Sequence, residues 1–278
     1  MSFAIRKPFT KFRKRRSASI RGGENLPLRV RTTSGLVEGK NVKLSNYTIV
    51  NQYLGIPYAE PPIGKYRWAK AMPRVKNDVY WNATYHRAIC PQSLQAPLPE
   101  YLLPIWYQKN SAFMKSFKMD ENCLHLNIYV PVKRKNKDGS QAMGITGKLP
   151  VMIYFHGFTY SEGSGNFFDG SILAAHGNVI VVTFNYRLGI LGFLSNGDEN
   201  LPGNYGLWDQ LQAVKWVTRN IGQFQGDEKR ITAFGSGAGA ASIGILMLSK
   251  QTEKNAKDGI KGERPVNITQ DYDWSHSR

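Results

Sequence analysis

The sequence predicts an α/β protein built around a doubly wound, mostly parallel sheet. The second half of the chain contains continuous apolar runs, rich in β-branched side chains, which are typical of strands buried on both faces. Helical segments with short links separate these runs, and repetition of this kind brings successive strands side by side in parallel. The predicted strands are 151–155, 178–185 and 230–234, and the predicted helices are 171–175, 204–221 and 238–249.

The N-terminal part is predicted to be β-rich. Residues 26–37 alternate between apolar and polar side chains around the turn residues 32–35, which indicates a hairpin. Residues 47–54 and 124–130 are further strand candidates by composition. Residues 57–72 are rich in proline, which excludes a regular helix or a central strand there.

The segment 204–221 has the clearest helical pattern. Gly222 follows its predicted end, as helix C-termini favour. We expect Trp208 and Trp216 to pack in the core. Four apolar side chains recur on one stripe of the helix: Leu207, Leu211, Val214 and Val217.

Composition indicates a folded but strongly basic protein. The 278 residues are 41% hydrophobic and 12% aromatic, which excludes a wholly disordered chain. Lys and Arg number 37 against 20 Asp and Glu, and ten of the basic residues lie in 1–32 with the single acid Glu24. Because such charge blocks stay solvated, we predict a disordered tail over 1–25, with binding of acidic surfaces through 1–32 as an alternative. Too few aromatic residues accompany the charges for a base-stacking platform, so nucleic-acid binding is not predicted.

The sequence predicts no export signal, no membrane span and no metal site. No apolar run of seven or more residues precedes the basic cluster and no run reaches eighteen, so neither a signal peptide nor a membrane span is predicted. His86, His125 and His176 lack metal-ligand spacing, and no metal or cofactor is predicted. We expect Asp169 and Arg187 to form a structural charge pair rather than to act in catalysis.

Cys90 and Cys123 are the two cysteines of the chain. Their spacing alone allows one disulfide or two buried thiols. Three sequons, at Asn46, Asn82 and Asn267, are candidate glycosylation sites if the chain is exported.

The most informative motif is Gly235-Ser236-Gly237-Ala238-Gly239, at the junction of a predicted strand and helix. In α/β-hydrolases this junction is the nucleophile elbow, G-x-S-x-G, with the attacking serine at its centre. The two outer glycines are present, but the central residue is Gly237, which has no hydroxyl. Ser236 lies one residue too early for the apex. Dinucleotide and Walker loops are excluded because their spacing is not met.

A second motif agrees with this interpretation. His156-Gly157-Phe158 follows a predicted strand where an oxyanion-hole loop of the H-G-G type would lie. Phe158 replaces the second glycine and is expected to restrict the backbone whose N–H groups would face an oxyanion. The elbow and the oxyanion loop are therefore both predicted to be degenerate.

Longer motifs resemble type-B carboxylesterases and cholinesterases. They lie at 53–68 (YLGIPYAEPPIGKYRW), 121–129 (ENCLHLNIY) and 185–194 (NYRLGILGFL), and the resemblance covers roughly 27–251. The FGSGAG segment at 234–239 looks like that of neuroligins, the catalytically inactive adhesion branch of the family. This resemblance implies an incomplete α/β-hydrolase fold with an N-terminal β-hairpin, over 26–252, followed by a divergent polar tail over 253–278.

The resemblance also implies features beyond the fold. Cys90 and Cys123 match the first disulfide of the family, and Asn82 fits a family glycosylation position. A neuroligin-like protein is expected at the synaptic cell surface, where it binds a neurexin-like partner in a calcium-dependent manner and forms a homodimer. Most of the contacting residues of the family are expected to lie outside this sequence.

The predicted function is therefore non-catalytic cell adhesion. A carboxylesterase that hydrolyses esters remains an alternative, and it requires a nucleophile at the elbow. A soluble basic protein that uses residues 1–32 is a further alternative.

Overall fold

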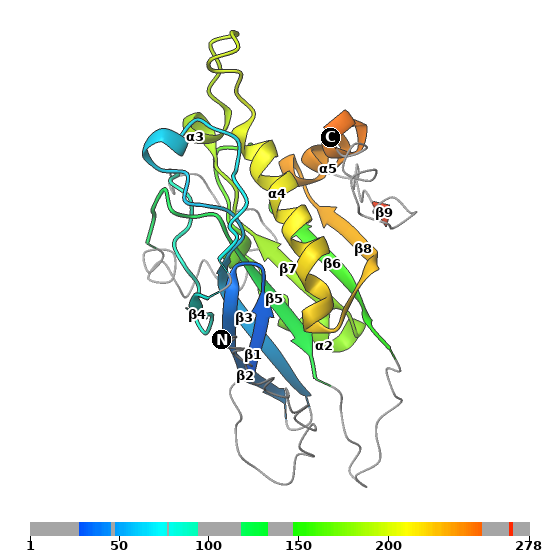
Figure 1. Ribbon diagram of the computed structural model, residues 1–278. Helices are drawn as coiled ribbons and strands as arrows, with labels where there is room; N and C mark the ends of the chain where they lie inside the picture. Colours follow the sequence, from blue (N-terminus) through cyan, green and yellow to red (C-terminus); the bar gives the residue numbers. More distant parts are fainter. Residues whose placement is uncertain are drawn as a thin grey trace, which may run out of the picture.

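A nine-stranded mixed sheet carries helices on both faces (Figure 1). The computed structural model describes residues 28–45, 48–76, 78–93, 118–132, 147–251 and 267–268. The predicted tail over 1–25 and nearly all of the predicted tail over 253–278 lie outside these residues, so both stay predictions.

The N-terminal strands form the antiparallel side of the sheet. Strand β1 (Leu28–Thr32) pairs with β2 (Gly35–Ser45), as the predicted hairpin requires. Strand β2 continues to β3 (Thr48–Pro57), and β3 pairs with β5 (His125–Pro131). The short strand β4 (Tyr80–Asn82), which the sequence pattern did not reveal, adds in parallel to β2.

The remaining strands form the parallel side. Strand β6 (Leu149–Phe155) lies between β7 (Ile180–Phe184) and β8 (Gly226–Gly235), parallel to both. Strand β9 (Asn267–Ile268) adds in parallel to the outer edge of β8. The sheet order β1-β2-β3-β5-β7-β6-β8-β9 confirms the predicted partial α/β-hydrolase class, with β5 and β7 joining the two sides in antiparallel fashion.

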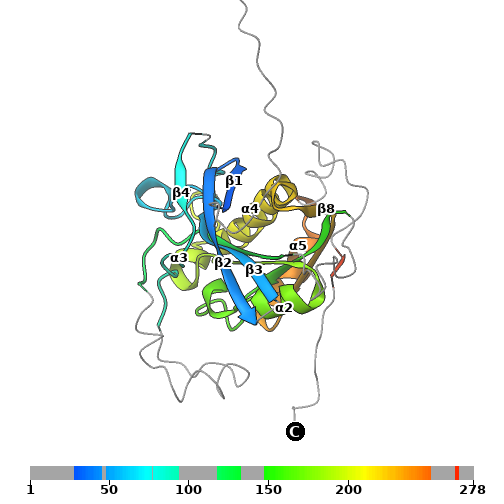
Figure 2. The same cartoon turned by 90° about the horizontal axis from the view of Figure 1, so that it is seen from below.

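Helices cover the sheet on opposite sides, as Figure 2 shows for α4 and α2. They are α2 (Ser171–Gly177), α3 (Gly189–Phe193), α4 (Tyr205–Asn220) and α5 (Ala238–Leu248), with short 3-10 turns at Gly64–Tyr66, Gly165–Phe167 and Ile221–Phe224. The predicted helices at 171–175, 204–221 and 238–249 correspond to α2, α4 and α5. Only α3 among the α-helices of the described residues was not predicted, because its five residues are too few for a periodic signal.

Strand β6 shows how the core is divided between the two faces. Val151, Ile153 and Phe155 are buried in the larger core, which also contains Trp216 of α4 and Ile243 of α5. The smaller core lies under α2 and contains Ala174, Ala175 and Val181. Because β7 contributes to both cores, all five of its residues are buried, as its continuous apolar run predicted.

Helix α5 is apolar nearly all round, but only part of it is covered. Its outer side exposes Ile245, Met247 and Leu248, with Leu248 at 88% of its full exposure. A helix without a polar face is normally enclosed by other elements. The described part of the chain therefore presents an apolar surface beside β8.

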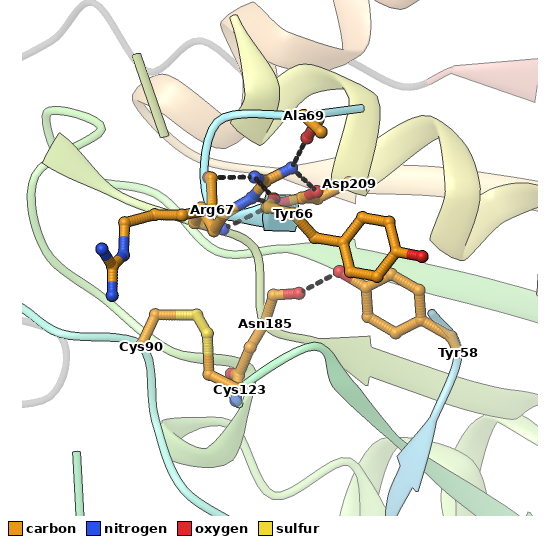
Figure 3. A network of polar contacts seen from close by, with 9 residues as sticks. Tyr58, Tyr66, Arg67, Ala69, Cys90, Cys123, Asn185 and Asp209 are labelled. Atoms are coloured by element: carbon orange, nitrogen blue, oxygen red, sulfur yellow. Dashed lines mark hydrogen bonds and ion pairs between the residues drawn. A yellow bond between two sulfur atoms is a disulfide. The ribbon is translucent and has the colours of Figure 1, made fainter. Parts of the chain in front are cut away.

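A buried ion pair joins the irregular loop 57–72 to helix α4. The Arg187 guanidinium donates to both carboxylate oxygens of Asp209 at 2.7 Å, and both side chains are almost fully buried. Its other N–H groups donate to three backbone carbonyls of the loop, those of Tyr66, Arg67 and Ala69 (Figure 3). All five guanidinium donors therefore have acceptors, and a buried charge needs this complete satisfaction to be tolerated.

Two expectations for individual side chains were wrong in part. Arg187 pairs with Asp209 and not with Asp169, which instead accepts the backbone N–H of Ser171 at 2.9 Å before α2. Trp216 is buried in the core as expected, whereas Trp208 is only half-buried and lies under the Lys70 ammonium at 4.2 Å. Trp208 lies outside the core because α4 turns this side of its surface toward the loop 57–72.

We predict that Asp209→Ala lowers the free energy of unfolding by about 3–5 kcal/mol, because it leaves the Arg187 charge buried without its partner. Urea unfolding followed by circular dichroism measures this change. The matched control is Asp227→Ala, which breaks the exposed pair with Arg230 and should cost less than about 1 kcal/mol. Equal losses in the two variants would contradict the role given to the buried pair.

Candidate functional site

The two motifs singled out in the sequence lie side by side at the carboxyl ends of β6 and β8. These strands are parallel neighbours in which Phe155 is opposite Gly235. The loop beginning at His156 and the turn at 235–239 therefore leave the same edge of the sheet together. Ligands of α/β proteins bind at this kind of edge.

The turn between β8 and α5 is sharp, and its tip is Gly237. This residue has φ 53° and ψ −125°, in the region that glycine adopts most easily. Gly237 is exposed, and a Cβ added there would find its nearest neighbours at 3.5 Å, in ordinary contact. The site thus has room for a side chain but holds a hydrogen atom.

The two outer glycines are required by close packing against β6. A Cβ on Gly235 would lie 2.5 Å from the carbonyl oxygen of Phe155, and one on Gly239 would lie 2.2 Å from the same oxygen. Both distances are far below a van der Waals contact. The geometry therefore gives the physical reason for the two glycines that frame Gly237.

Phe158 brings its backbone directly onto the turn. It adopts φ 77°, which is uncommon for a side chain of its size. Its carbonyl oxygen accepts the backbone N–H of Ala238 at 3.0 Å. In α/β-hydrolases the N–H of the residue after the nucleophile is one of the two oxyanion-hole donors. Here that N–H already has an acceptor within the chain.

Ser236 does not stand at the tip of the turn. It is half-buried and packs against the neighbouring loop, because a Cβ on Gly157 would lie 2.2 Å from the Ser236 carbonyl oxygen and 3.2 Å from its Oγ. Its hydroxyl therefore lies on the side that faces Gly157 rather than at the exposed apex.

Two histidines are buried in their neutral form: His156, which follows β6, and His125, which begins β5 two residues after the disulfide-bonded Cys123. Burial lowers the pKa of His156 to about 3, and its ring stacks on Tyr186 with centroids 4.1 Å apart. Burial, reinforced by the Arg87 charge, lowers the pKa of His125 to about 4, and this ring stacks on Trp81. Among the described residues, no recorded contact brings either imidazole to the Gly237 tip.

Cys90 and Cys123 form a disulfide, which resolves the alternative that spacing left open. It fastens the segment after β4 to the start of β5 and leaves no free cysteine. Of the three sequons, Asn82 is exposed at the end of β4, Asn46 lies outside the described residues, and Asn267 is described only through the backbone of β9.

The described ranges contain neither a metal-binding cluster nor a membrane-spanning helix. No group of three or more His, Cys, Asp or Glu residues in them is arranged to hold a metal ion. None of the helices within the same ranges has the length and apolarity that crossing a bilayer requires.

Two contacts, one structural and one at the candidate site, were not predicted from sequence. Asp209 lies at helical spacing between the buried residues Tyr205 and Ala213, and an acid on a buried stripe was the signal that could have identified it. The bond from Ala238 to Phe158 left no such signal, because it joins two backbone groups whose approach depends on the tertiary fold.

Comparisons with known proteins agree with this architecture. A model of the carboxylesterase family matches residues 27–262. Neuroligin-3 of Mus musculus is 44% identical over 241 residues, which are 81% of this chain and 29% of the relative. Neuroligin-2 of Homo sapiens is 45% identical over 246 residues, 84% of this chain and 29% of the relative. Carboxylesterase 5A of Felis catus is 41% identical over 220 residues, 78% of this chain and 37% of the relative.

The chain belongs to the carboxylesterase family. Within that family it is neuroligin-like, with Neuroligin-2 and Neuroligin-3 among its similar relatives. The chain spans about a third of the length of these relatives.

We predict that acidification destabilises the protein through His125 and His156. Their folded-state pKa values lie below the ordinary 6.5, so from pH 6.5 down to about 4 the unfolded state binds protons that the folded state cannot. Stability is therefore full above pH 6.5 and falls as pH drops, by roughly 1.4 kcal/mol per pH unit for each histidine.

Urea midpoints measured between pH 7.5 and 4.5 test this. His125→Phe keeps a ring against Trp81 and should flatten the slope, whereas His176→Gln, at an exposed position, should leave it unchanged. An unaltered slope in His125→Phe would refute the assignment.

We also predict that the turn tolerates a side chain at Gly237 better than at Gly239. Gly237→Ala should cost about 1–3 kcal/mol, the strain of a left-handed backbone without a clash. Gly239→Ala should cost more, because the new Cβ would displace the Phe155 carbonyl and with it strand β6. Thermal denaturation of the two variants gives the order, and the reverse order would contradict the packing described here.

Proposed function

We propose that this chain is a non-catalytic, cholinesterase-like adhesion protein. Gly237 is the observation that carries the proposal. It stands at the exposed tip of the strand–helix turn, with φ and ψ that suit an elbow and with space for a side chain that is absent. We assign this tip as the nucleophile position of the family. Loss of a serine nucleophile removes about a millionfold in turnover.

The blocked backbone donor supports the same conclusion independently. Removal of one oxyanion-hole donor costs about 100- to 1000-fold in hydrolases. In this chain the Ala238 N–H is held by the Phe158 carbonyl, so an oxyanion at the tip would have to displace a hydrogen bond already formed. Restoring a hydroxyl at 237 alone would leave this second defect in place.

The proposed role is recognition at the cell surface. The neuroligin-like relatives support a synaptic membrane protein that binds a neurexin-type partner, and the disulfide fits an oxidising, extracellular location. Calcium dependence of this binding and a homodimer belong to the same proposal. The described residues contain no cluster arranged to hold a metal ion, so the proposal places no calcium site among them.

Binding to neurexin and covalent labelling test the proposal together. Cells that display the chain should bind a soluble neurexin ectodomain in calcium and lose it in EDTA. The binding should be weaker than that of the positive control, Neuroligin-2, because most of the contacting residues of the family are expected to lie outside this sequence. The purified chain should hydrolyse no short acyl ester and should not react with a fluorophosphonate probe. Gly237→Ser should label about 100- to 1000-fold more slowly than an active esterase, because the Ala238 donor stays engaged.

Labelling of the unmodified chain would overturn the non-catalytic assignment in favour of an esterase. In that event Ser236→Ala identifies the source, since loss of label would place the nucleophile at Ser236. Absence of neurexin binding by the displayed chain would overturn the adhesion partner instead.

A further inference from the structure

The loop between α3 and α4 contains the one Asn-Gly pair of the sequence, Asn196-Gly197. Residues 194–204, called the α3–α4 loop here, project beyond the body of the molecule in Figure 1. Asn196 and Gly197 are both exposed, and Gly197 adopts φ 83°. A Cβ built on Gly197 would meet no atom within 4 Å, so the pair is open to water and no side chain shields the Gly197 backbone nitrogen.

The side-chain amide of Asn196 is folded back onto the chain that follows it. Its Oδ1 atom accepts the backbone N–H of Asp198 at 3.2 Å, and its Nδ2 atom donates to Asp198 Oδ2 at 2.7 Å. The first of these bonds closes an Asx-turn, in which the side chain mimics a backbone turn around the next peptide unit. The carbonyl carbon Cγ of Asn196 is therefore held beside the Gly197 peptide instead of turning freely in solvent.

Neighbouring groups activate both atoms that would react. The backbone N–H of Gly197 donates to Ser195 Oγ at 3.1 Å, so an acceptor for the proton of the attacking nitrogen is already in place. The Asp198 N–H on Oδ1 polarises the Asn196 carbonyl and remains in position to bind the negative charge that develops there during attack. Residues 195–198 thus supply a nucleophile, a proton acceptor and an oxyanion donor.

We propose that Asn196 is a modification site, at which the folded chain converts the side-chain amide spontaneously into aspartate and isoaspartate. The conversion needs no enzyme and no cofactor, only water. It goes beyond the proposed adhesion function and does not depend on it, because the reacting groups all belong to the α3–α4 loop.

The first step of the conversion forms a succinimide ring. The Gly197 nitrogen forms a bond to Asn196 Cγ, the bond from Cγ to Nδ2 breaks, and Nδ2 leaves as ammonia with the electron pair and the proton lost by the Gly197 nitrogen. In the second step water adds to one of the two ring carbonyls. Opening at Cγ gives aspartate and opening at the Asn196 backbone carbonyl gives isoaspartate, so nothing is oxidised or reduced.

A similar turn at Asn82 shows what the α3–α4 loop adds. Asn82 Oδ1 likewise accepts the backbone N–H of the residue two positions on, Thr84, at 3.1 Å. There, however, the intervening nitrogen belongs to Ala83, whose N–H donates to the Glu38 carbonyl at 2.8 Å beside the pairing of β4 with β2. The Ala83 side chain is fully buried. Its nitrogen is thus committed to the sheet, whereas that of Gly197 lies in an open loop.

The conversion would replace an attraction in the α3–α4 loop with a repulsion. The N–H groups of Leu201 and Asn200 donate to Asp198 Oδ1 at 3.0 and 2.7 Å and hold the pKa of this carboxyl below its ordinary value, so it is ionised at neutral pH. Its other oxygen accepts from Asn196 Nδ2. A carboxylate at 196 has no such donor and would bring a like charge to the same contact, so the loop is expected to rearrange irreversibly after conversion.

Incubation of the purified full chain at physiological pH and temperature tests the proposal. Mass spectrometry of the peptide containing Asn196 follows the conversion of the amide, and an isoaspartate-specific methyltransferase measures the isoaspartate formed. A synthetic peptide of residues 193–203 has the same sequence without the fold and provides the reference rate. Asn200, in the same loop but followed by the bulky Leu201, is the internal control.

We expect Asn196 to convert about fivefold faster in the folded chain than in the peptide, the rate equivalent of one net hydrogen bond. Ser195→Ala removes the acceptor for the Gly197 proton and should lower the rate toward that of the peptide, whereas Ser195→Thr keeps a hydroxyl and should retain the acceleration. Glu199→Gln is the matched control, since it changes an exposed neighbour that takes no part in these contacts, and should leave the rate unchanged. Asn200 should stay intact over the same period.

A folded chain that converts Asn196 no faster than the peptide would overturn the inference, and so would a Ser195→Ala variant as fast as the unmodified chain. Circular dichroism shows whether each variant keeps the native fold. Should Ser195→Ala lose that fold, the comparison between the folded chain and the peptide decides the question alone.

Discussion

The buried contact between Arg187 and Asp209 is the constraint on which the arrangement of this chain depends. Strand β7, helix α4 and the proline-rich loop 57–72 have no regular hydrogen-bond ladder in common. The guanidinium supplies the missing connection, because one planar group donates to a carboxylate on α4 and to three loop carbonyls at once. A lysine could not replace it, since an ammonium has three donors and no fixed fork. The charge is thus buried at the point where three irregularly joined elements meet.

Much of the fold could be predicted because apolar patterning reports directly on burial. The runs that became β6, β7 and β8 were identified from their composition, and α4 from its periodic stripe. Only β7, the run with continuous apolarity, is buried along its whole length, whereas β6 alternates and β8 exposes residues 228–230. Strand β4 was missed because three residues with two exposed side chains carry no pattern of their own. Its place depends on pairing with β2, which is distant in sequence. The antiparallel junction of β5 and β7 is likewise a property of chain direction, which composition does not encode.

The candidate site was predictable in its residue types but not in its backbone contacts. The glycines at 235, 237 and 239 could be interpreted from their spacing, because it matches the strand–helix turn of α/β-hydrolases. The contact with the Phe155 carbonyl that requires Gly235 and Gly239 became visible only in the structure. The partner of Arg187 was assigned wrongly, since charge pairing between distant residues is decided by tertiary packing. The engagement of the Ala238 N–H by Phe158 required coordinates for the same reason. Together these features describe a hydrolase scaffold in which recognition, rather than chemistry, is the proposed remaining role.

The backbone angles of Gly237 have an evolutionary consequence. A side chain held at φ 53° and ψ −125° stores about 1–3 kcal/mol of strain, which an enzyme tolerates because the strain presents its nucleophile. Glycine adopts the same angles without that penalty. On the proposal made here, the substitution that ended catalysis also relaxed the turn, in line with the general conflict between stability and activity. On the same proposal, a serine at 237 would bring the strain back without restoring full turnover, because the Phe158 carbonyl would still accept the Ala238 N–H.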